Sequence, residues 1–189
     1  MSCCCPEARS AAKFFSLFAK NYRKRYAKKG FEKSQKQLVE GIRQAGFQDA
    51  SLLEIGSGIG YLHQTLIEQG AASAVGVDLS PKMISEARIG AEEKGLSDRV
   101  RYIEDDFVGM EEELDQVEIT IMDKVVCCYP HAELLINSSI VKTKRVYALT
   151  YPRDRWFIRM AMGVMAFFLK LSGSSFRAFV HDPDNIERW

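Results

Sequence analysis

The segment "SLLEIGSGIGYLHQTL" (residues 51–66) sets three glycines between an apolar run and an amphipathic one. The apolar run predicts a short buried strand, and the amphipathic run predicts a helix that ends at Gly70. Glycines at such a strand-to-helix turn permit unusual backbone angles and allow a ligand to contact the main chain. The exposed N–H groups at the start of the helix favour an anionic or polar group. The turn at residues 56–60 is therefore a predicted ligand site.

Strands and helices alternate along the chain after this segment. Short apolar runs predict further strands at residues 73–80, 100–107, 117–123 and 145–152. The helix predicted over residues 81–94 has Ser80 as its N-cap and Pro81 at its first position. Because parallel strands need such crossover helices, this order predicts an α/β fold. The expected architecture is a Rossmann-like three-layer αβα sandwich with a mostly parallel sheet.

The first 46 residues predict an N-terminal helical arm or cap, ahead of a main domain over residues 47–189. Aromatic residues recur there at steps of three and four, which is typical of an amphipathic helix, at Phe14, Phe15, Phe18, Tyr22 and Tyr26. Residues 1–36 carry ten Lys or Arg and two Asp or Glu, a net charge of +8, whereas the remainder is at −7. Such an arm can meet an anionic substrate, a membrane surface or nucleic acid, or it can be a solvated helix face.

The composition is that of an ordinary globular protein, with 189 residues of which 47% are hydrophobic and 27% charged. No apolar run is long enough for a membrane-spanning helix, and no secretory signal is expected. The five cysteines lie in two clusters, at residues 3–5 and 127–128. This is no disulfide framework, so we expect reduced thiols and a cytoplasmic location, with peripheral membrane contact as an alternative. The clusters also lack the spacing of a zinc site, so no metal is predicted.

Acidic residues stand at three of the predicted strand ends. Glu54 lies two residues before the first glycine, where a carboxylate suits a positive amino group better than a pyrophosphate. Asp78 ends the second strand, where a carboxylate accepts both hydroxyls of a ribose. Asp106 ends the third strand and can accept a hydrogen bond from an adenine amino group, while Phe107 offers its backbone N–H. Carboxyl ends of parallel strands share one edge of the sheet, so the three groups together predict S-adenosylmethionine as the ligand.

This set of residues resembles the class I S-adenosylmethionine-dependent methyltransferases. The resemblance covers about residues 51–152. The third glycine comes one residue earlier than in the dinucleotide fingerprint, so NAD binding and an unrelated Rossmann-type turn are the weaker alternatives. The resemblance implies that the glycines pack on the methionine part of the cofactor. The cofactor-binding residues that it implies are Glu54, Gly56, Ser57, Gly58, Gly60, Asp78, Leu79, Asp106, Phe107 and Asp123.

The stretch "DKVVCCYP" (residues 123–130) resembles a finer branch, the small-molecule methyltransferases that act on quinone precursors and on magnesium-protoporphyrin. In this chain Cys128 stands where many relatives of the quinone branch carry histidine. The resemblance implies a small, apolar or aromatic acceptor that is methylated at oxygen or carbon. Two alternatives remain, a nucleic-acid methyltransferase that uses the basic arm and a non-catalytic S-adenosylmethionine-binding module. The chain lacks the Asn/Asp-Pro-Pro-Tyr/Phe signature of base-amino methylases, which disfavours nucleic acid.

Three residues are candidates for orienting or deprotonating the acceptor, namely Tyr129, His131 and His181. Methyl transfer needs mainly alignment, because the sulfonium is a good leaving group. A base matters only where the acceptor must lose a proton. The apolar, methionine-rich segment at residues 153–172 predicts an inserted lid helix that packs in the core or covers an apolar acceptor. We expect this helix and the N-terminal helices to roof the acceptor site.

The end of the sequence departs from the pattern that the resemblance implies. Methyltransferases of this class normally add a helix and an antiparallel hairpin after the fifth strand, and the sequence up to Trp189 contains only the start of that helix. We therefore expect the last antiparallel strands to be missing, with truncation as the favoured reason. The fifth strand would then be an exposed edge of the sheet. Lowered stability or a compensating oligomer is the expected consequence.

Overall fold

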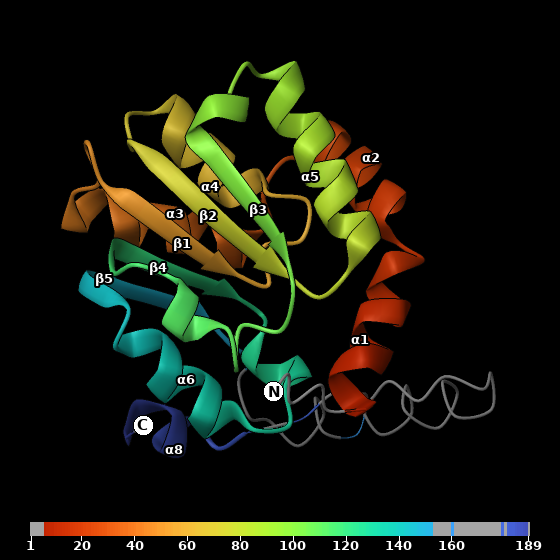
Figure 1. Cartoon of the computed structure of the whole chain (residues 1–189), viewed down its shortest axis with the longest axis vertical. Helices are drawn as coiled ribbons and strands as arrows, with labels where there is room; N and C mark the ends of the chain where they lie inside the picture. Colours follow the sequence, from red (N-terminus) through yellow and green to blue (C-terminus); the bar gives the residue numbers. More distant parts are fainter. Residues whose placement is uncertain (1–5, 153–159, 161–178, 180, 189) are drawn as a thin grey trace.

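The computed structural model describes residues 6–152, 160, 179 and 181–188, and it has the predicted α/β architecture (Figure 1). The five strands are β1 (Ser51–Ile55), β2 (Ser73–Asp78), β3 (Val100–Glu104), β4 (Val117–Asp123) and β5 (Thr143–Thr150). The helices in these ranges are α1 (Pro6–Ser16), α2 (Ala19–Lys29), α3 (Lys33–Ala45), α4 (Tyr61–Glu68), α5 (Pro81–Glu93), α6 (Ala132–Ile140) and α8 (Pro183–Arg188). Short 3₁₀ helices are η1 (Ser97–Arg99), η2 (Glu111–Glu113) and η3 (Val126–Cys128).

The strands form one parallel sheet in the order β3-β2-β1-β4-β5. The chain starts in the middle of the sheet, moves to one edge and then crosses to the other side. The direction of this movement reverses between β1 and β4. Open α/β sheets bind ligands at such a switch point, outside the carboxyl ends of the strands. The strand arrows in Figure 1 point toward α1 and the first turns of α5, so these helices lie at the ligand-binding edge.

Alternating side chains of each strand build one hydrophobic core on either face of the sheet. On one face, Leu52 of β1 and Ile119 of β4 pack with apolar residues of α3, α4 and α5. On the other face, Leu53 and Met122 pack with residues of α6 and α8. This alternation follows from the two-residue period of a strand. The two cores confirm the predicted three-layer sandwich.

The amphipathic helix expected near the N-terminus is divided into two. α1 and α2 are separated at residues 17–18, where two backbone hydrogen bonds of the i,i+3 type replace the regular helical pattern. The two helices therefore take different paths: α1 lies at the carboxyl ends of the strands, whereas α2 runs alongside α5 (Figure 1). Gly30 ends α2 with a φ of 64°, in agreement with the predicted end of the helix. Ala19 of α2 is buried against Met83 of α5.

α3 belongs to the main body of the fold, although the predicted arm included it. Leu38, Val39 and Ile42 of this helix are buried in the same core as Leu66 of α4. Of the residues expected to form the arm or cap, α1 and α2 are the ones that lie outside the layers over the sheet. We refer to α1 and α2 together as the helical cap.

Two predicted features lie outside the described residues. These are the lid helix at residues 153–172, of which only Met160 is described, and the cysteine run at residues 3–5. α6, between β4 and β5, was not predicted. None of the helices in the described ranges combines the length and the apolar character needed to cross a bilayer.

β5 is an edge strand in the described part of the chain. All five strands found there are parallel, and β5 pairs with β4 alone. Every residue of β5 is half-buried or exposed, whereas most residues of β4 are buried. Within the described ranges, β5 is therefore the edge strand that was expected. Val146 and Tyr147 still pack on opposite cores, so the two faces of β5 remain covered.

Candidate functional site

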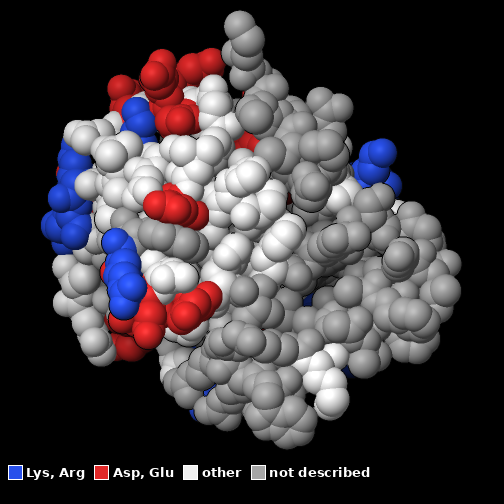
Figure 2. All heavy atoms as spheres, turned by 90° about the horizontal axis from the view of Figure 1, so that it is seen from below, with Lys and Arg blue, Asp and Glu red and all other residues white. Residues whose placement is uncertain are grey.

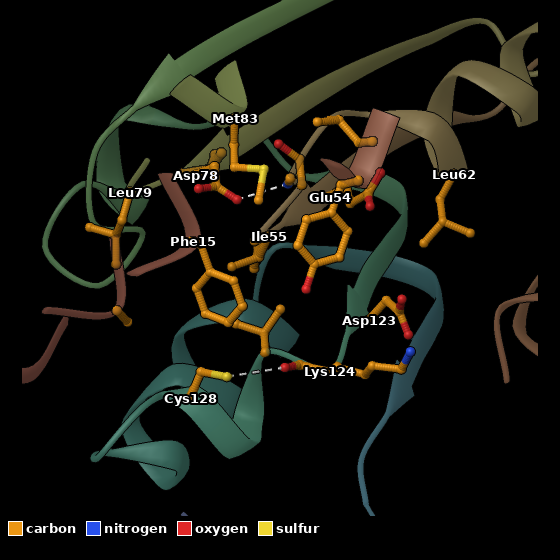
Figure 3. A pocket seen from close by; sticks show the side chains of 18 of the residues that line it. Phe15, Glu54, Ile55, Leu62, Asp78, Leu79, Met83, Asp123, Lys124 and Cys128 are labelled. Carbon is orange, nitrogen blue, oxygen red and sulfur yellow. Dashed lines mark hydrogen bonds between the residues drawn. The ribbon is translucent and has the colours of Figure 1, made fainter. Parts of the chain in front are cut away.

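A cavity of about 510 Å³ lies at the carboxyl ends of the strands. Nine of the ten predicted cofactor-binding residues line it, and Gly60 does not. In Figure 3 the side chains of Glu54, Asp78 and Asp123 surround this space, and Phe15 of α1 lies between Asp78 and Cys128. The cavity thus has strand ends on one side and the helical cap on the other.

The glycine turn has positive φ angles at all three glycines, 64° at Gly56, 53° at Gly58 and 77° at Gly60. Side chains disfavour this region of backbone space. An added Cβ would lie 2.4 Å from Val125 Cγ2 at Gly56 and 2.7 Å from the Tyr102 hydroxyl at Gly60, so these two glycines are required by contacts within the protein. An added Cβ at Gly58 would meet nothing within 4 Å, and Gly58 lines the cavity. Gly58 is therefore where a ligand can lie against the main chain.

Asp78 is held in place by the backbone on both sides. Its Oδ2 accepts a hydrogen bond from Gly58 N at 2.8 Å, and its Oδ1 accepts one from Ser80 N at 2.8 Å. A carboxylate has about four acceptor positions, so two remain for the hydroxyl groups of a ligand. Burial raises the pKa of Asp78 to about 6 against the opposing effect of the two backbone bonds, and Glu54 adds to the rise.

Glu54 is buried at the end of β1, with 3% of its surface exposed. Its Oε2 accepts hydrogen bonds from the backbone N of His63 at 3.2 Å and from His63 Nδ1 at 2.6 Å. His63 lies on α4, is fully buried, and contacts Tyr102 through its other ring nitrogen. Sequence reasoning did not select His63. The available signal was a polar residue in the predicted helix directly after the glycine turn.

Asp106 and Tyr129 form a buried pair at the end of β3. The Tyr129 hydroxyl donates to both carboxylate oxygens of Asp106, at 3.0 and 3.1 Å, and Val108 N donates to Oδ1 at 3.2 Å. Burial raises the pKa of Asp106, and the bond from Tyr129 opposes this rise. Phe107 is buried and also lines the cavity. Tyr129, a candidate for acid–base chemistry on the acceptor, thus contacts a predicted adenine-binding residue.

Asp123 connects the end of β4 to α3 and to the end of β5. Its carboxylate accepts hydrogen bonds from Gln35 Nε2 at 2.8 Å and from the Thr150 hydroxyl at 2.5 Å. The next residue, Lys124, has a φ of 60°, which is uncommon for a residue with a side chain. Lys124 Nζ pairs with Glu32 at 2.5 Å. The end of β4 is thereby tied to residues between α2 and α3.

Cys127 and Cys128 both line the cavity, with their sulfur atoms 3.8 Å apart. Both thiols donate to the carbonyl of Lys124, at 3.2 and 3.6 Å. The contact with Cys128 lowers the pKa of Cys127, whereas the same contact and burial raise the pKa of Cys128. Within the described ranges, no group of three or more His, Cys, Asp or Glu is arranged to hold a metal ion.

The two candidate histidines lie outside the cavity lining. His131 is exposed at the N-terminus of α6. His181 Nε2 lies 3.3 Å from the Tyr129 carbonyl oxygen, behind the residue that binds Asp106. Of the three acceptor-side candidates, Tyr129 is the one that lines the cavity.

The helical cap supplies the aromatic side of the cavity, with Phe14 and Phe15 from α1 and Tyr22 and Tyr26 from α2. Tyr26 stacks on Tyr61 of α4, with ring centroids 3.6 Å apart. The aromatic spacing predicted an amphipathic helix. The sequence also predicts that the N-terminal helices roof the acceptor site, and the structure places their aromatic side chains in the cavity lining together with the glycine turn.

These residues fit S-adenosylmethionine, because the open Gly58 and the carboxylates of Glu54, Asp78 and Asp106 stand along one cavity. Residues 52–142 match the family model described as a methyltransferase domain. A ribosomal protein L11 methyltransferase of Pasteurella multocida is 35% identical over 63 residues, which are 33% of this chain and 22% of that protein. The matched segments thus span between 18% and 31% of the length of these curated relatives.

Solved structures share the fold over most of the chain. Magnesium protoporphyrin IX methyltransferase from Synechocystis PCC 6803, with bound S-adenosylhomocysteine, superposes with a TM-score of 0.73 at 18% identity, over 96% of this chain and 86% of that one. A methyltransferase in complex with the Haloferax volcanii activator Trm112 gives 0.70 at 13% identity, over 96% and 73%. Residues 52–142 therefore form a methyltransferase domain of the class I type, whose cofactor is S-adenosylmethionine.

Proposed function

We propose that the protein transfers the methyl group of S-adenosylmethionine to a small, apolar or aromatic acceptor, at oxygen or carbon. The observation that carries this proposal is the two-sided lining of the cavity, with carboxylates at the strand ends and aromatic side chains of the helical cap opposite them. The polar side suits the cofactor and the aromatic side suits the acceptor. The name of the Synechocystis relative, a magnesium protoporphyrin IX methyltransferase, agrees with a small apolar acceptor.

The cofactor supplies a methyl group on a sulfonium centre, so the chain has mainly to bind and align. In this proposal Asp78 binds the ribose hydroxyls, Glu54 the amino group and Asp106 the adenine. Asp78 is already held by two backbone N–H groups, and this fixes its carboxylate before a ligand arrives. Phe15 and the neighbouring aromatic side chains exclude water and hold the acceptor against the methyl group.

The ionisable side chains that line the cavity favour an acceptor that ionises easily. The Tyr129 hydroxyl donates its hydrogen bond to Asp106. We therefore assign Tyr129 to positioning Asp106, the proposed adenine-binding residue. His131 and His181 are not among the cavity-lining residues of the described structure. Tyr22 does line the cavity, although 41% of its surface is exposed. A phenol is protonated near neutral pH, so Tyr22 can donate to an acceptor oxygen. A phenol or a carboxylic acid fits these groups best.

A nucleic-acid acceptor has less support. Two arginines of the basic arm are engaged within the protein, because Arg23 pairs with Glu86 and Glu93 and Arg25 pairs with Glu32. Figure 2 views the molecule from the side on which α6 and α8 lie. On this face, most of the described charged side chains lie at one side, where both signs are present, next to an uncharged region.

The tip between α1 and α2 supports peripheral membrane contact. Leu17 is 72% exposed and Phe18 is 39% exposed, and the exposed Lys13 and Lys20 flank them. Apolar residues flanked by cations are typical of helices that lie in a membrane interface. Sedimentation with phosphatidylserine vesicles tests this contact. Leu17→Glu should reduce the bound fraction, and equal binding of both proteins would contradict the contact.

Transfer of labelled methyl tests the proposed function. The acceptors are phenolic quinone precursors and porphyrin carboxylic acids, in parallel with total RNA and ribosomal protein. Label should enter a small lipophilic product, and Phe15→Glu, which places a charge on the aromatic side, should abolish it. Leu17→Glu is the matched control, because Leu17 does not line the cavity. Label in the RNA or protein fraction would contradict the proposal, and cofactor binding without any labelled product would favour the non-catalytic module.

A further inference from the structure

A chain of buried polar side chains lies behind Glu54. His63 contacts Glu54 through Nδ1 at 2.6 Å and the hydroxyl of Tyr102 through Nε2 at 2.9 Å. Gln64 Nε2 donates to the same hydroxyl at 2.8 Å and to the carbonyl of Ala87 at 3.0 Å. Glu54, His63 and Gln64 are at most 3% exposed. Buried polar groups of this kind hold a defined geometry when they find partners, and within the described contacts the buried Oε1 of Gln64 has none.

The contacts determine where the protons lie in this chain. The amide nitrogen of Gln64 can only donate, so the Tyr102 oxygen accepts from it and has its own proton available for His63 Nε2. Burial raises the pKa of Tyr102, so the phenol keeps this proton. His63 then carries its ring proton on Nδ1 and donates it to Glu54. We call the hydrogen-bonded series Gln64, Tyr102, His63 and Glu54 the relay. It ends at the Glu54 carboxylate, which accepts from two N–H groups of His63, one in the ring and one in the backbone.

Both of these bonds go to one oxygen of Glu54. They fall on Oε2, so within the described contacts Oε1 remains available to a ligand in the cavity that Glu54 lines. Glu54 also comes two residues before Gly56, at the start of the glycine turn. A carboxylate held by these two bonds keeps its direction when the cavity is empty.

We propose that His63, supported by Tyr102, is a positioning residue for the cofactor. It holds Glu54 so that Oε1 receives the α-ammonium group at the amino-acid end of S-adenosylmethionine. This inference rests on the proposed cofactor role of Glu54. The proposal has a specific consequence for binding. The relay increases the affinity only of ligands that carry the ammonium group, whereas a packing role of His63 would change the affinity of every ligand that binds in the cavity.

Two ligands separate these roles, S-adenosylhomocysteine and 5′-methylthioadenosine, which shares the nucleoside but lacks the amino-acid end. His63→Leu should weaken binding of S-adenosylhomocysteine by about tenfold or more, because a hydrogen bond to a charged group is lost. Binding of 5′-methylthioadenosine should change by less than about twofold. His63→Asn should restore most of the lost affinity, because its side-chain amide can donate in place of Nδ1.

Two further variants guard against a folding defect. Tyr102→Phe removes one oxygen and should weaken S-adenosylhomocysteine selectively, in the same direction as His63→Leu. Leu66→Val is the matched control on α4, since Leu66 is fully buried and does not line the cavity. This variant should leave the ratio of the affinities for S-adenosylhomocysteine and 5′-methylthioadenosine unchanged. Equal weakening of both ligands in the His63 and Tyr102 variants, or no weakening of either ligand, would overturn the proposal.

The same titrations distinguish this inference from the proposed function. Failure of the wild-type protein to bind S-adenosylhomocysteine would contradict the cofactor site itself. A selective loss of affinity for S-adenosylhomocysteine in the variants supports the relay even if no methyl acceptor has been found, because only binding is measured.

Discussion

The two sides of the cavity are attached to the protein in different ways. On the cofactor side, Asp78 is half-buried and is fixed by the backbone N–H groups of Gly58 and Ser80. The helical cap is held in part by ion pairs between partly exposed side chains, such as Arg25 with Glu32 at 2.7 Å. The first side is built from neighbours of the strand ends, whereas the second packs on the main body through contacts such as Ala19 with Met83 and is connected to the end of β4 by the pair of Glu32 with Lys124.

This difference indicates that the two sides of the cavity have different roles. Backbone bonds to buried carboxylates give one fixed geometry, which suits a cofactor that is the same in every turnover. Ion pairs between partly exposed groups typically contribute only about 0–1 kcal/mol each. Regions held by few buried contacts open at lower free energy than the core. We therefore expect the cap to open and admit the acceptor while the cofactor side stays in place.

The largest expected effect comes from the glycine turn on the cofactor side. In Gly56→Ala the added Cβ both occupies a positive φ and lies 2.4 Å from Val125 Cγ2. The expected loss in the free energy of unfolding is about 2 kcal/mol or more, together with loss of cofactor binding. Urea unfolding and titration with S-adenosylhomocysteine measure the two effects.

Gly58→Ala is the matched variant, because it has a positive φ but no clash within the protein. It should cost only about 1–2 kcal/mol of unfolding free energy and still lose most cofactor affinity, since the added methyl group can lie where the ligand packs. If Gly58→Ala binds the cofactor as well as the wild type, the ligand does not lie against this turn.

The second prediction is a pH dependence that belongs to the cofactor side. Burial raises the pKa of Asp78 to about 6, so its carboxylate is ionised above this pH and becomes protonated below it. A protonated carboxyl loses acceptor capacity for ribose hydroxyls. Affinity for S-adenosylhomocysteine should therefore be steady from pH 7 to 8 and should fall toward tenfold per pH unit below about 6.

Calorimetry in buffers of matched ionic strength measures this profile. Asp78→Asn should bind weakly and show a flat profile through the same window. If the wild type keeps its full affinity at about pH 5, the ionised form of Asp78 does not contribute to cofactor binding.

The smallest expected effect concerns the cap. Glu32→Gln removes ion pairs with Arg25 and Lys124, whose side chains are all more than a third exposed, so the change in unfolding free energy should stay below about 1 kcal/mol. Cofactor affinity should change by less than about twofold. The expected signature is local, namely faster hydrogen exchange of α2 amides.

Glu118→Gln is a well-matched control for this prediction. Glu118 also contacts two cations, Lys144 and Arg145, at 4.0 and 3.5 Å, and its side chain has the same 37% exposure as that of Glu32. It does not line the cavity. Equal exchange rates of α2 in both variants would mean that the pairs at Glu32 do not hold the cap.

The cofactor side could be predicted from the sequence because each of its residues stands at a fixed distance from a strand end. Apolar runs located β1, β2 and β3, and Glu54, Asp78 and Asp106 followed from those positions. Parallel strands bring such ends together at one edge. The match of residues 52–142 to a methyltransferase domain lies on this same part of the chain.

Neither the contacts that hold the cap nor the relay behind Glu54 could be predicted in this way. The bond between Gln35 and Asp123 joins residues 88 positions apart, and nothing local in the sequence specifies it. The break between α1 and α2 contains no glycine or proline that would mark it. His63 is a single polar residue in a helix whose other buried residues are mostly apolar, and its role follows only from its distance to Glu54.

The most direct test of the account is calorimetric titration of S-adenosylmethionine, S-adenosylhomocysteine and NAD into the wild type, Asp78→Ala and Asp105→Ala. Asp105 also lines the cavity but is exposed, so it is the matched control. We expect the wild type and Asp105→Ala to bind the first two ligands in the micromolar range, Asp78→Ala to bind neither, and NAD to bind to none of the three proteins. Binding of NAD, or binding of S-adenosylhomocysteine to Asp78→Ala with wild-type affinity, would contradict the assignment of this cavity to S-adenosylmethionine.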